Sequence, residues 1–158
     1  MKTHLYTATV TWTGNTGTGT SQYNAYDRSH IISIPGKDPI AGSSDPSFRG
    51  DRTKYNPEEL LVSALSCCHM LWYLHLCATH QVVVIKYTDE AQGVMEENQD
   101  GSGQFSAVTL QPKVAVAEQR MVEKALHLHE EANKMCFIAR SMKFPVLHKP
   151  QVITIEKH

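Results

Sequence analysis

One uninterrupted apolar stretch, residues 56–80 with the sequence NPEELLVSALSCCHMLWYLHLCATH, constrains the fold of this chain more than any other feature. Asn56 is a favoured N-cap residue, Pro57 suits the first helical position, and Glu58 and Glu59 favour the positive end of the helix dipole. Glu59 lies three residues after Asn56, the spacing of a capping box. No glycine or proline interrupts residues 60–78. The stretch therefore predicts one long helix that begins at Pro57.

This predicted helix is apolar in nearly every direction around its axis. A helix of that kind belongs at the centre of a protein or in a membrane. Polar side chains break the apolar run at five positions: Ser63, Ser66, His69, Tyr73 and His75. We therefore expect a buried central helix and not a membrane span.

Size, charge and cysteine content favour a single cytoplasmic domain. The 158 residues suit one domain, 1–158, with a sizeable core. Fifteen basic and sixteen acidic residues give a net charge of −1 without a long basic run, so we expect no nucleic-acid partner. The first residues lack the apolar core of a signal peptide, and four cysteines are too few for a disulfide scaffold. We expect cytoplasmic localisation, no membrane partner and reduced thiols.

The remaining sequence predicts strands before and after the central helix. Tyr6, Ala8, Val10 and Trp12 alternate with threonines, which is typical of a strand with one buried face. We expect the following strands, loops and helices, in chain order: further strands ending near residue 26 and at 30–34, an irregular loop at 35–55, a hairpin of strands at 82–95 and 108–116, an amphipathic helix at 118–135, and a strand at 152–155. The three N-terminal strands would form an antiparallel meander. The whole order predicts an α+β fold with the apolar helix under or between sheets.

Several kinds of chemistry lack their sequence patterns. The chain has no Cys-x-x-Cys pair and no His-Glu-x-x-His motif, and Cys68, His75 and Cys77 do not share one helix face, so we expect no metal site. No Gly-x-Ser-x-Gly elbow supports a serine hydrolase, and no Gly-x-Gly-x-x-Gly or Walker pattern supports a nucleotide cofactor. We expect no cofactor.

Thiol chemistry remains. Cys68 and Cys136 each lie in or near a predicted helix. A reactive cysteine needs a nearby cation that stabilises its thiolate, and an arginine from residues 48–52 could supply it, held in turn by a glutamate. The alternative is that cysteines in an apolar helix are small core residues, which is how we interpret Cys67 and Cys77.

These residues resemble a known family. Asn56-Pro57-Glu58-Glu59-Leu60, followed by a cysteine twelve residues after the asparagine, is similar to the OsmC/Ohr family of thiol peroxidases, and the resemblance covers nearly the whole chain. It implies an OsmC-like fold of antiparallel sheets around a long buried central helix, in an intertwined homodimer. It implies a peroxidatic cysteine at Cys68, a second cysteine at Cys136, and a paired glutamate at Glu58. The arginine falls on Arg49, with Arg52 as the alternative.

The resemblance also implies the reaction. It implies that this protein reduces organic hydroperoxides to alcohols through a Cys68 sulfenic acid and a Cys68–Cys136 disulfide, which an external dithiol of lipoyl type then reduces. One departure is that Phe137, Ile138 and Ala139 follow Cys136, where the family has Pro-x-Ser. This departure favours the alternative function, a non-enzymatic redox sensor or small-ligand-binding protein on the same fold.

Helix geometry adds an expectation about assembly. Glu58 and Cys68 are ten residues apart, about 15 Å along one helix, so one chain alone does not bring their side chains together. Two copies crossing antiparallel near Ser63 would do so, and the residues around this point are small: Ala64, Ser66 and Cys67. We therefore expect a two-fold dimer in which Glu58 and Arg49 of one chain meet Cys68 of the other.

Overall fold

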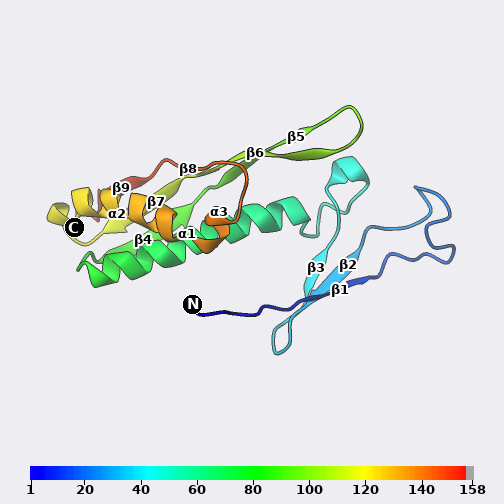
Figure 1. The fold of residues 1–158 in the computed structure, drawn as a ribbon, viewed down its shortest axis with the longest axis horizontal. Coiled ribbons are helices and arrows are strands. Elements are labelled where there is room, and N and C mark those ends of the chain that lie inside the picture. Colours follow the sequence, from blue (N-terminus) through cyan, green and yellow to red (C-terminus); the bar gives the residue numbers. More distant parts are fainter. Residues whose placement is uncertain (156–158) are drawn as a thin grey trace. The chain divides into compact units, whose positions relative to one another are not determined.

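The computed structural model describes residues 1–155, and its chain forms two compact units (Figure 1). The first unit spans Met1–Leu60 and the second begins at Leu61. The boundary falls within the first turn of helix α1, Pro57–Thr79. Each unit is described below by itself.

A small antiparallel sheet forms the first unit. It consists of β1 (Thr9–Trp12), β2 (His30–Ser33) and β3 (Ile40–Gly42), in that order, and a 3-10 turn, η1 (Pro46–Phe48), follows it. The three-stranded meander is confirmed, but its third strand is β3, from the segment predicted to be an irregular loop. The polar strand predicted before Tyr26 is wrong, because only an isolated bridge joins Tyr26 to Asn15.

Turn chemistry explains that difference. Asn15 Oδ1 accepts hydrogen bonds from the amides of Gly17 and Gly19, both of which have positive φ. This arrangement folds the segment after β1 into turns, which interrupt any continuous ladder. The predicted buried face of β1 is also not covered within the unit, because Val10 is 64% exposed.

Helix α1 confirms the predicted start of the central helix. The Asn56 side chain accepts a hydrogen bond from the Glu59 amide at 2.8 Å, and Glu59 Oε2 accepts one from the Asn56 amide at 3.2 Å. This reciprocal pair is the predicted capping box. The helix ends at Thr79, and Gln81 then turns the chain with a φ of 61°.

Only one narrow stripe of α1 is buried. Leu65, His69, Tyr73 and Cys77 follow one another at intervals of four residues. By length and composition α1 is the one helix in residues 1–155 that could cross a membrane, and only 22% of its most apolar stretch is buried in the single chain. Core helices of soluble proteins share this length and composition, and we interpret α1 as one of them, with its remaining surface open in the single chain. Its opposite face, which includes Ala64, Cys67 and the 62%-exposed Leu71, is open in the single chain.

Two three-stranded sheets follow α1 in the second unit. The first contains β4 (Val84–Asp89), β7 (Pro112–Val116) and β9 (Gln151–Thr154), and the second contains β5 (Gln92–Glu97), β6 (Gly103–Leu110) and β8 (Val146–His148). In each sheet the first two strands pair antiparallel, whereas β8 and β9 pair in parallel with β6 and β7. The sheets are thus mixed and not purely antiparallel as expected.

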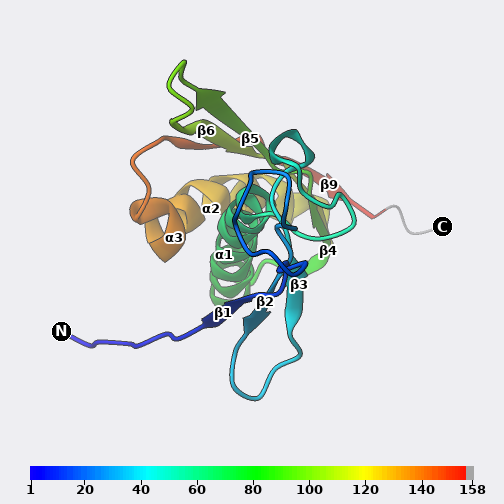
Figure 2. The same cartoon turned by 90° about the vertical axis from the view of Figure 1, so that its right-hand side faces the viewer.

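The predicted hairpin of 82–95 and 108–116 is divided between these two sheets. Pro112 has no amide hydrogen to donate, and the Gln111 amide instead donates to Asp89 Oδ1 at 2.6 Å. Both features interrupt the backbone hydrogen bonds between the two predicted strands near residues 89–92 and 111–112. The first predicted strand is therefore divided into β4 and β5, and the second into β6 and β7. Figures 1 and 2 show the far part of the β5–β6 hairpin projecting from the rest of this unit.

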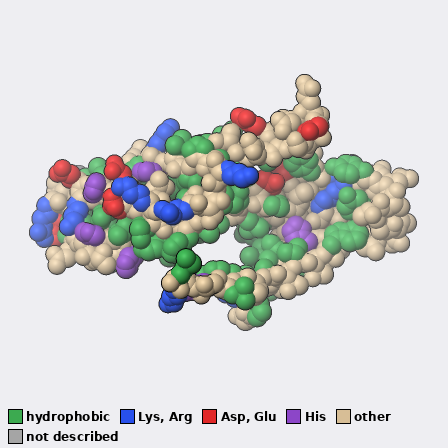
Figure 3. Space-filling model, viewed as in Figure 1, with side chains coloured by type: hydrophobic (Ala, Val, Ile, Leu, Met, Phe, Trp, Pro, Cys, Tyr) green, Lys and Arg blue, Asp and Glu red, His purple; other side chains and the backbone are tan. Residues whose placement is uncertain are grey.

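Two helices after β7 complete the second unit. A 3-10 turn, η2 (Gln119–Met121), leads into α2 (Val122–Met135), and the short α3 (Phe137–Arg140) follows after Cys136. Tyr73 and Cys77 of α1 pack with Ala125 and Leu128 of α2 in one buried cluster. Leu65 packs with β6 in a second cluster. On the face seen in Figure 3, some hydrophobic side chains of this unit are exposed at the surface, among charged and histidine side chains.

Candidate functional site

The structure brings Cys68 and Cys136 together. Their side chains interact directly, and this interaction, after burial, is a cause of the raised pKa of the Cys136 thiol. Cys68 is half-buried in the middle of α1, whereas Cys136 is 1% exposed at the junction of α2 and α3. The two cysteines singled out from sequence are therefore neighbours, 68 residues apart in the chain.

Cys136 lies where the helical chain is interrupted. Its φ of −66° and ψ of 110° are extended, which ends α2 and begins α3. Its Sγ accepts a hydrogen bond from the Ala139 amide at 3.4 Å, so the thiol is the N-cap of α3. The sequence Cys-Phe-Ile-Ala thus still positions a cysteine at a helix start, without the proline of the family pattern.

The other two cysteines have different surroundings. Cys67, one residue before Cys68, is exposed in the single chain, so its interpretation as a core residue is wrong for this chain; the rotation of about 100° between neighbouring helix positions points it away from the buried stripe. Cys77 is buried, and burial raises the pKa of its thiol. Tyr73, one turn earlier, lies against that thiol. Cys77 is a core residue, whereas Cys67 lies on the open face of α1.

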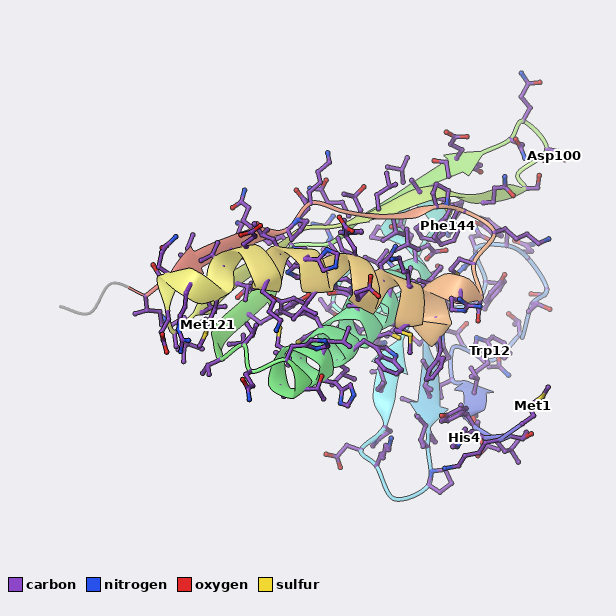
Figure 4. All side chains as sticks on the ribbon, turned by 60° about the vertical axis from the view of Figure 1, so that its left-hand side comes forward. Met1, His4, Trp12, Asp100, Met121 and Phe144 are labelled. Atoms are coloured by element: carbon purple, nitrogen blue, oxygen red, sulfur yellow. The ribbon has the colours of Figure 1, made fainter. Side chains whose placement is uncertain are left out.

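Two aromatic residues that lie near the two cysteines in sequence contact each other. The Trp72 ring contacts the Phe137 ring edge to face, with centroids 5.6 Å apart, and Phe137 immediately follows Cys136 in the chain. Phe137 itself is 67% exposed. An apolar groove of about 500 Å³ lies further along the same segment, between β6 and residues 141–145. Phe144, labelled in Figure 4, lies on this segment between α3 and β8 and helps to line the groove.

A stack of histidine and tyrosine rings lies beside the cysteines. His69 and His129 are both 0% exposed, and His69 Nε2 lies 3.0 Å from His129 Nδ1 in a hydrogen bond between α1 and α2. Tyr73 stacks on His129 with ring centroids 3.8 Å apart. Burial lowers the pKa of His69 to about 4 and that of His129 to about 3, so both rings are neutral near pH 7.

The ring stack was not predicted from the sequence. His69 was expected only as a polar position on the central helix, and His129 had no predicted role. One pattern in the sequence could have indicated the stack: Leu65, His69 and Tyr73 are spaced four residues apart, which places His69 on one face of the central helix between two large side chains. A histidine at the centre of a buried stripe must find a polar partner in the core.

Arg49 and Arg52 lie in the first unit, in the loop before α1. Arg49 caps η1 with a φ of 62°, a left-handed conformation that costs a residue with a side chain about 1–3 kcal/mol. It borders a polar hollow of about 280 Å³ together with Asp51 and Lys54. Arg52 is exposed. Within residues 1–155 of this single chain, neither arginine forms an ion pair with Glu58.

Glu58 lies in the first turn of α1 with an unusual environment for a carboxylate. Its Oε2 atom is buried and has no hydrogen-bond partner among the described residues of the chain. A buried carboxylate oxygen without a donor is unfavourable, so this atom is suited to receive a cation that the single chain does not supply.

Comparisons with known proteins agree with this architecture. An OsmC-like protein of unknown function from Vibrio cholerae superposes with a TM-score of 0.85 at 29% identity, over 94% of this chain and all of that chain. An organic hydroperoxide resistance protein from Elizabethkingia anophelis superposes with a TM-score of 0.68 at 20% identity, over 98% of this chain and all of that chain. At that identity the likeness shows the fold alone.

A third structure, an organic hydroperoxide resistance protein from Legionella pneumophila, superposes with a TM-score of 0.64 at 13% identity, over 95% of this chain and 98% of that chain. No curated protein matches the chain. The family model described as OsmC-like protein matches residues 50–150, which include the end of the arginine loop, α1, Cys68, Cys136 and every strand of the two later sheets except β9. By this match over most of its length, the chain belongs to the OsmC family.

Proposed function

We propose that this protein is a thiol-dependent peroxidase that reduces organic hydroperoxides to alcohols. The observation that carries the proposal is the direct interaction of the Cys68 side chain, in the middle of α1, with the Cys136 side chain at the end of α2. Family membership adds support, because the OsmC family includes proteins named for organic hydroperoxide resistance.

The proposed cycle has three steps that balance. The Cys68 thiolate attacks the distal oxygen of the hydroperoxide, the O–O bond breaks, and the alkoxide takes a proton and leaves as the alcohol. Cys68 is now a sulfenic acid. The Cys136 thiol attacks the Cys68 sulfur, the S–O bond breaks, and the hydroxide leaves with the thiol proton as water. An external dithiol then reduces the disulfide by thiol exchange.

Exposure and pKa support the two proposed roles. Cys68 is half-buried and can be reached by a peroxide, whereas Cys136 is only 1% exposed. Burial and the Cys68 side chain together raise the pKa of Cys136, so it stays a neutral thiol. A neutral thiol does not compete for the peroxide but still supplies the proton for the water that leaves.

The surroundings favour apolar substrates. Trp72 and Phe137 are the aromatic residues nearest in sequence to the two cysteines, and the apolar groove of about 500 Å³ continues along the same segment. We therefore propose organic hydroperoxides as substrates and a dithiol of lipoyl type as reductant. The cycle suits a reducing compartment such as the cytoplasm, because both cysteines must return to thiols.

The complete site requires a second copy of the chain. Glu58 and Cys68 are about 15 Å apart along α1, and the buried Oε2 of Glu58 has no hydrogen-bond partner among residues 1–155 of its own chain. We propose an intertwined two-fold dimer in which Arg49, held by Glu58, lies beside Cys68 of the partner and stabilises the thiolate and the leaving oxygen. The open face of α1, with Ala64 and Cys67, permits close approach of two helices.

Steady-state turnover of cumene hydroperoxide and t-butyl hydroperoxide with dihydrolipoamide tests the function. The proposal expects repeated turnover, with both substrates preferred over hydrogen peroxide, and a Cys68–Cys136 disulfide in the oxidised protein by mass spectrometry. One oxidation per chain without further turnover would instead identify a redox sensor. Absence of any fast thiol at neutral pH would leave only a structural role for the cysteines.

A further inference from the structure

His69 and His129 form a polar link between α1 and α2 inside an otherwise apolar core. The rings are almost parallel, with an interplanar angle of 7°, and His69 Nε2 lies 3.0 Å from His129 Nδ1. A hydrogen bond at this distance needs one nitrogen as donor and the other as acceptor, so the accepting ring must be neutral and the two rings cannot both be charged. Their lowered pKa values agree with this requirement.

The ring pair has few alternative partners. The remaining nitrogens, His69 Nδ1 and His129 Nε2, are buried without a hydrogen-bond partner in the described part of the chain. His148 of β8 stacks on His69 with centroids 5.9 Å apart, yet residues 1–155 contain no group of three His, Cys, Asp or Glu side chains placed to hold a metal ion. The pair is therefore a link between helices and not a ligand set.

A single buried hydrogen bond of this kind fixes one register between two helices. Sliding or rotating α2 against α1 would leave two more nitrogens unpaired in the core, which costs more than the bond itself contributes. Tyr73 strengthens the same alignment, because its ring stacks on His129 from the next turn of α1.

The thiol pair depends on that register. His69 directly follows Cys68 in α1, and His129 lies two turns before Cys136, about 10.5 Å along α2. Trp72, one turn after Cys68, contacts Phe137, the residue that follows Cys136. Each cysteine is thus within about two turns, on its own helix, of one polar and one aromatic contact between α1 and the segment 129–137.

We propose that His69 and His129 are positioning residues that hold Cys68 and Cys136 within reach of each other for disulfide formation. This inference rests on the proposed peroxidase function and concerns its second step. Neither histidine touches the peroxide; they act through the alignment of α1 and α2. A displacement of about 1 Å between reacting groups lowers a rate by up to about a hundredfold.

The test compares three variants of the full chain. His129→Leu removes the link with little change in volume, and His129→Asn keeps a polar atom near the position of Nδ1. Leu128→Ala is the matched control, because Leu128 is buried on the same helix turn but forms no part of the ring pair. For each variant, dimedone trapping gives the rate of Cys68 sulfenic acid formation, and mass spectrometry gives the rate of the Cys68–Cys136 disulfide.

We expect His129→Leu to form sulfenic acid at the wild-type rate and the disulfide at least about tenfold more slowly. His129→Asn should recover part of that loss, and Leu128→Ala should lower Tm while keeping the disulfide rate. A wild-type disulfide rate in His129→Leu would overturn the proposal. So would an equal loss in Leu128→Ala, because general destabilisation would then explain both.

Two further measurements keep the inference testable. If His129→Leu does not fold, NMR of histidine-labelled wild-type protein should show a protected imidazole N–H that shifts when the disulfide forms; an unchanged or rapidly exchanging signal would overturn the positioning role. Oxidation with diamide bypasses the peroxide. If the wild type forms the disulfide with diamide but never turns over peroxide, the peroxidase proposal fails while the positioning of the thiols by the histidines stands.

Discussion

The Ala139 amide donates a hydrogen bond to Cys136 Sγ at 3.4 Å, so the thiol that contacts Cys68 also caps α3. Helix α3 has only four residues and buries none of them. The start of this short helix is thereby tied to the state of one sulfur atom.

Two substitutions at Cys136 distinguish its role as the N-cap of α3 from its proposed role in disulfide formation. Cys136→Ser keeps a capping oxygen, whereas Cys136→Ala removes the cap and should lower the free energy of unfolding by a further ~1 kcal/mol. Both variants should oxidise once at Cys68 and then stall, with progressive overoxidation of the sulfenic acid. Urea unfolding and mass spectrometry after peroxide give the two readouts. Turnover at the wild-type rate in either variant would exclude Cys136 as the resolving cysteine.

Substitutions at the vicinal cysteines test which thiol attacks the peroxide. Cys68→Ser should abolish turnover, whereas Cys67→Ser should retain most of it, because Cys67 is exposed and Cys68 interacts with Cys136. The measurement is initial rate with cumene hydroperoxide, with Cys77→Ser as a control for a buried thiol outside the site. Equal losses at positions 67 and 68 would contradict the assignment.

A mixed dimer tests whether the site is shared. A chain with Cys68→Ser and a chain with Glu58→Ala should each be impaired alone, and their heterodimer should recover about half the wild-type activity if Glu58 acts on the partner's thiol. That recovery arises because one of the two sites then holds an intact Cys68 and an intact Glu58. A heterodimer no better than its parents, or a monomer at assay concentration, speaks against the shared site.

The buried imidazoles predict a loss of stability in acid. His69 and His129 have folded-state pKa values of about 4 and about 3, below the unfolded value of about 6.5, because burial disfavours their charged forms. The unfolded chain therefore gains protons first as pH falls. The free energy of unfolding should not depend on these two histidines above about pH 6.5, and their protonation in the unfolded chain should lower it by on the order of a few kcal/mol at pH 4.

The variant His129→Leu isolates that contribution. Tyr73 and His148 are the titratable groups stacked on the pair, and both remain in this variant. Thermal unfolding from pH 7 to pH 4 should show a smaller fall in Tm for His129→Leu than for the wild type. A parallel fall in the two proteins would mean that carboxylates elsewhere cause the acid sensitivity.

Local sequence rules predicted the parts of this fold that short-range chemistry determines. The capping box of Asn56 and Glu59 and the start of α1 are examples, because cap and helix lie within one turn. The division of the long hairpin at Pro112 required knowledge of the Asp89 carboxylate, which comes from the facing strand. Strands β8 and β9 pair in parallel with β6 and β7, and no residue pattern within either short strand predicts that pairing.

The same limit applies to the candidate site. Family spacing singled out Cys68 and Cys136, and the structure makes them neighbours, whereas His129 lies 60 residues from His69 and meets it only through the packing of α2 on α1. Arg49 and Glu58 stay predictions, because their proposed partner thiol belongs to another copy of the chain.

The open face of α1 has a consequence for how activity depends on the amount of protein. Where each site draws on two chains, dilution below the dissociation constant of the dimer removes sites as well as dimers. The number of complete sites then rises with the square of chain concentration, and Tm rises with concentration too. Such a protein would respond to its own expression level as a threshold, nearly silent when scarce and fully active once the helices of two chains cover each other.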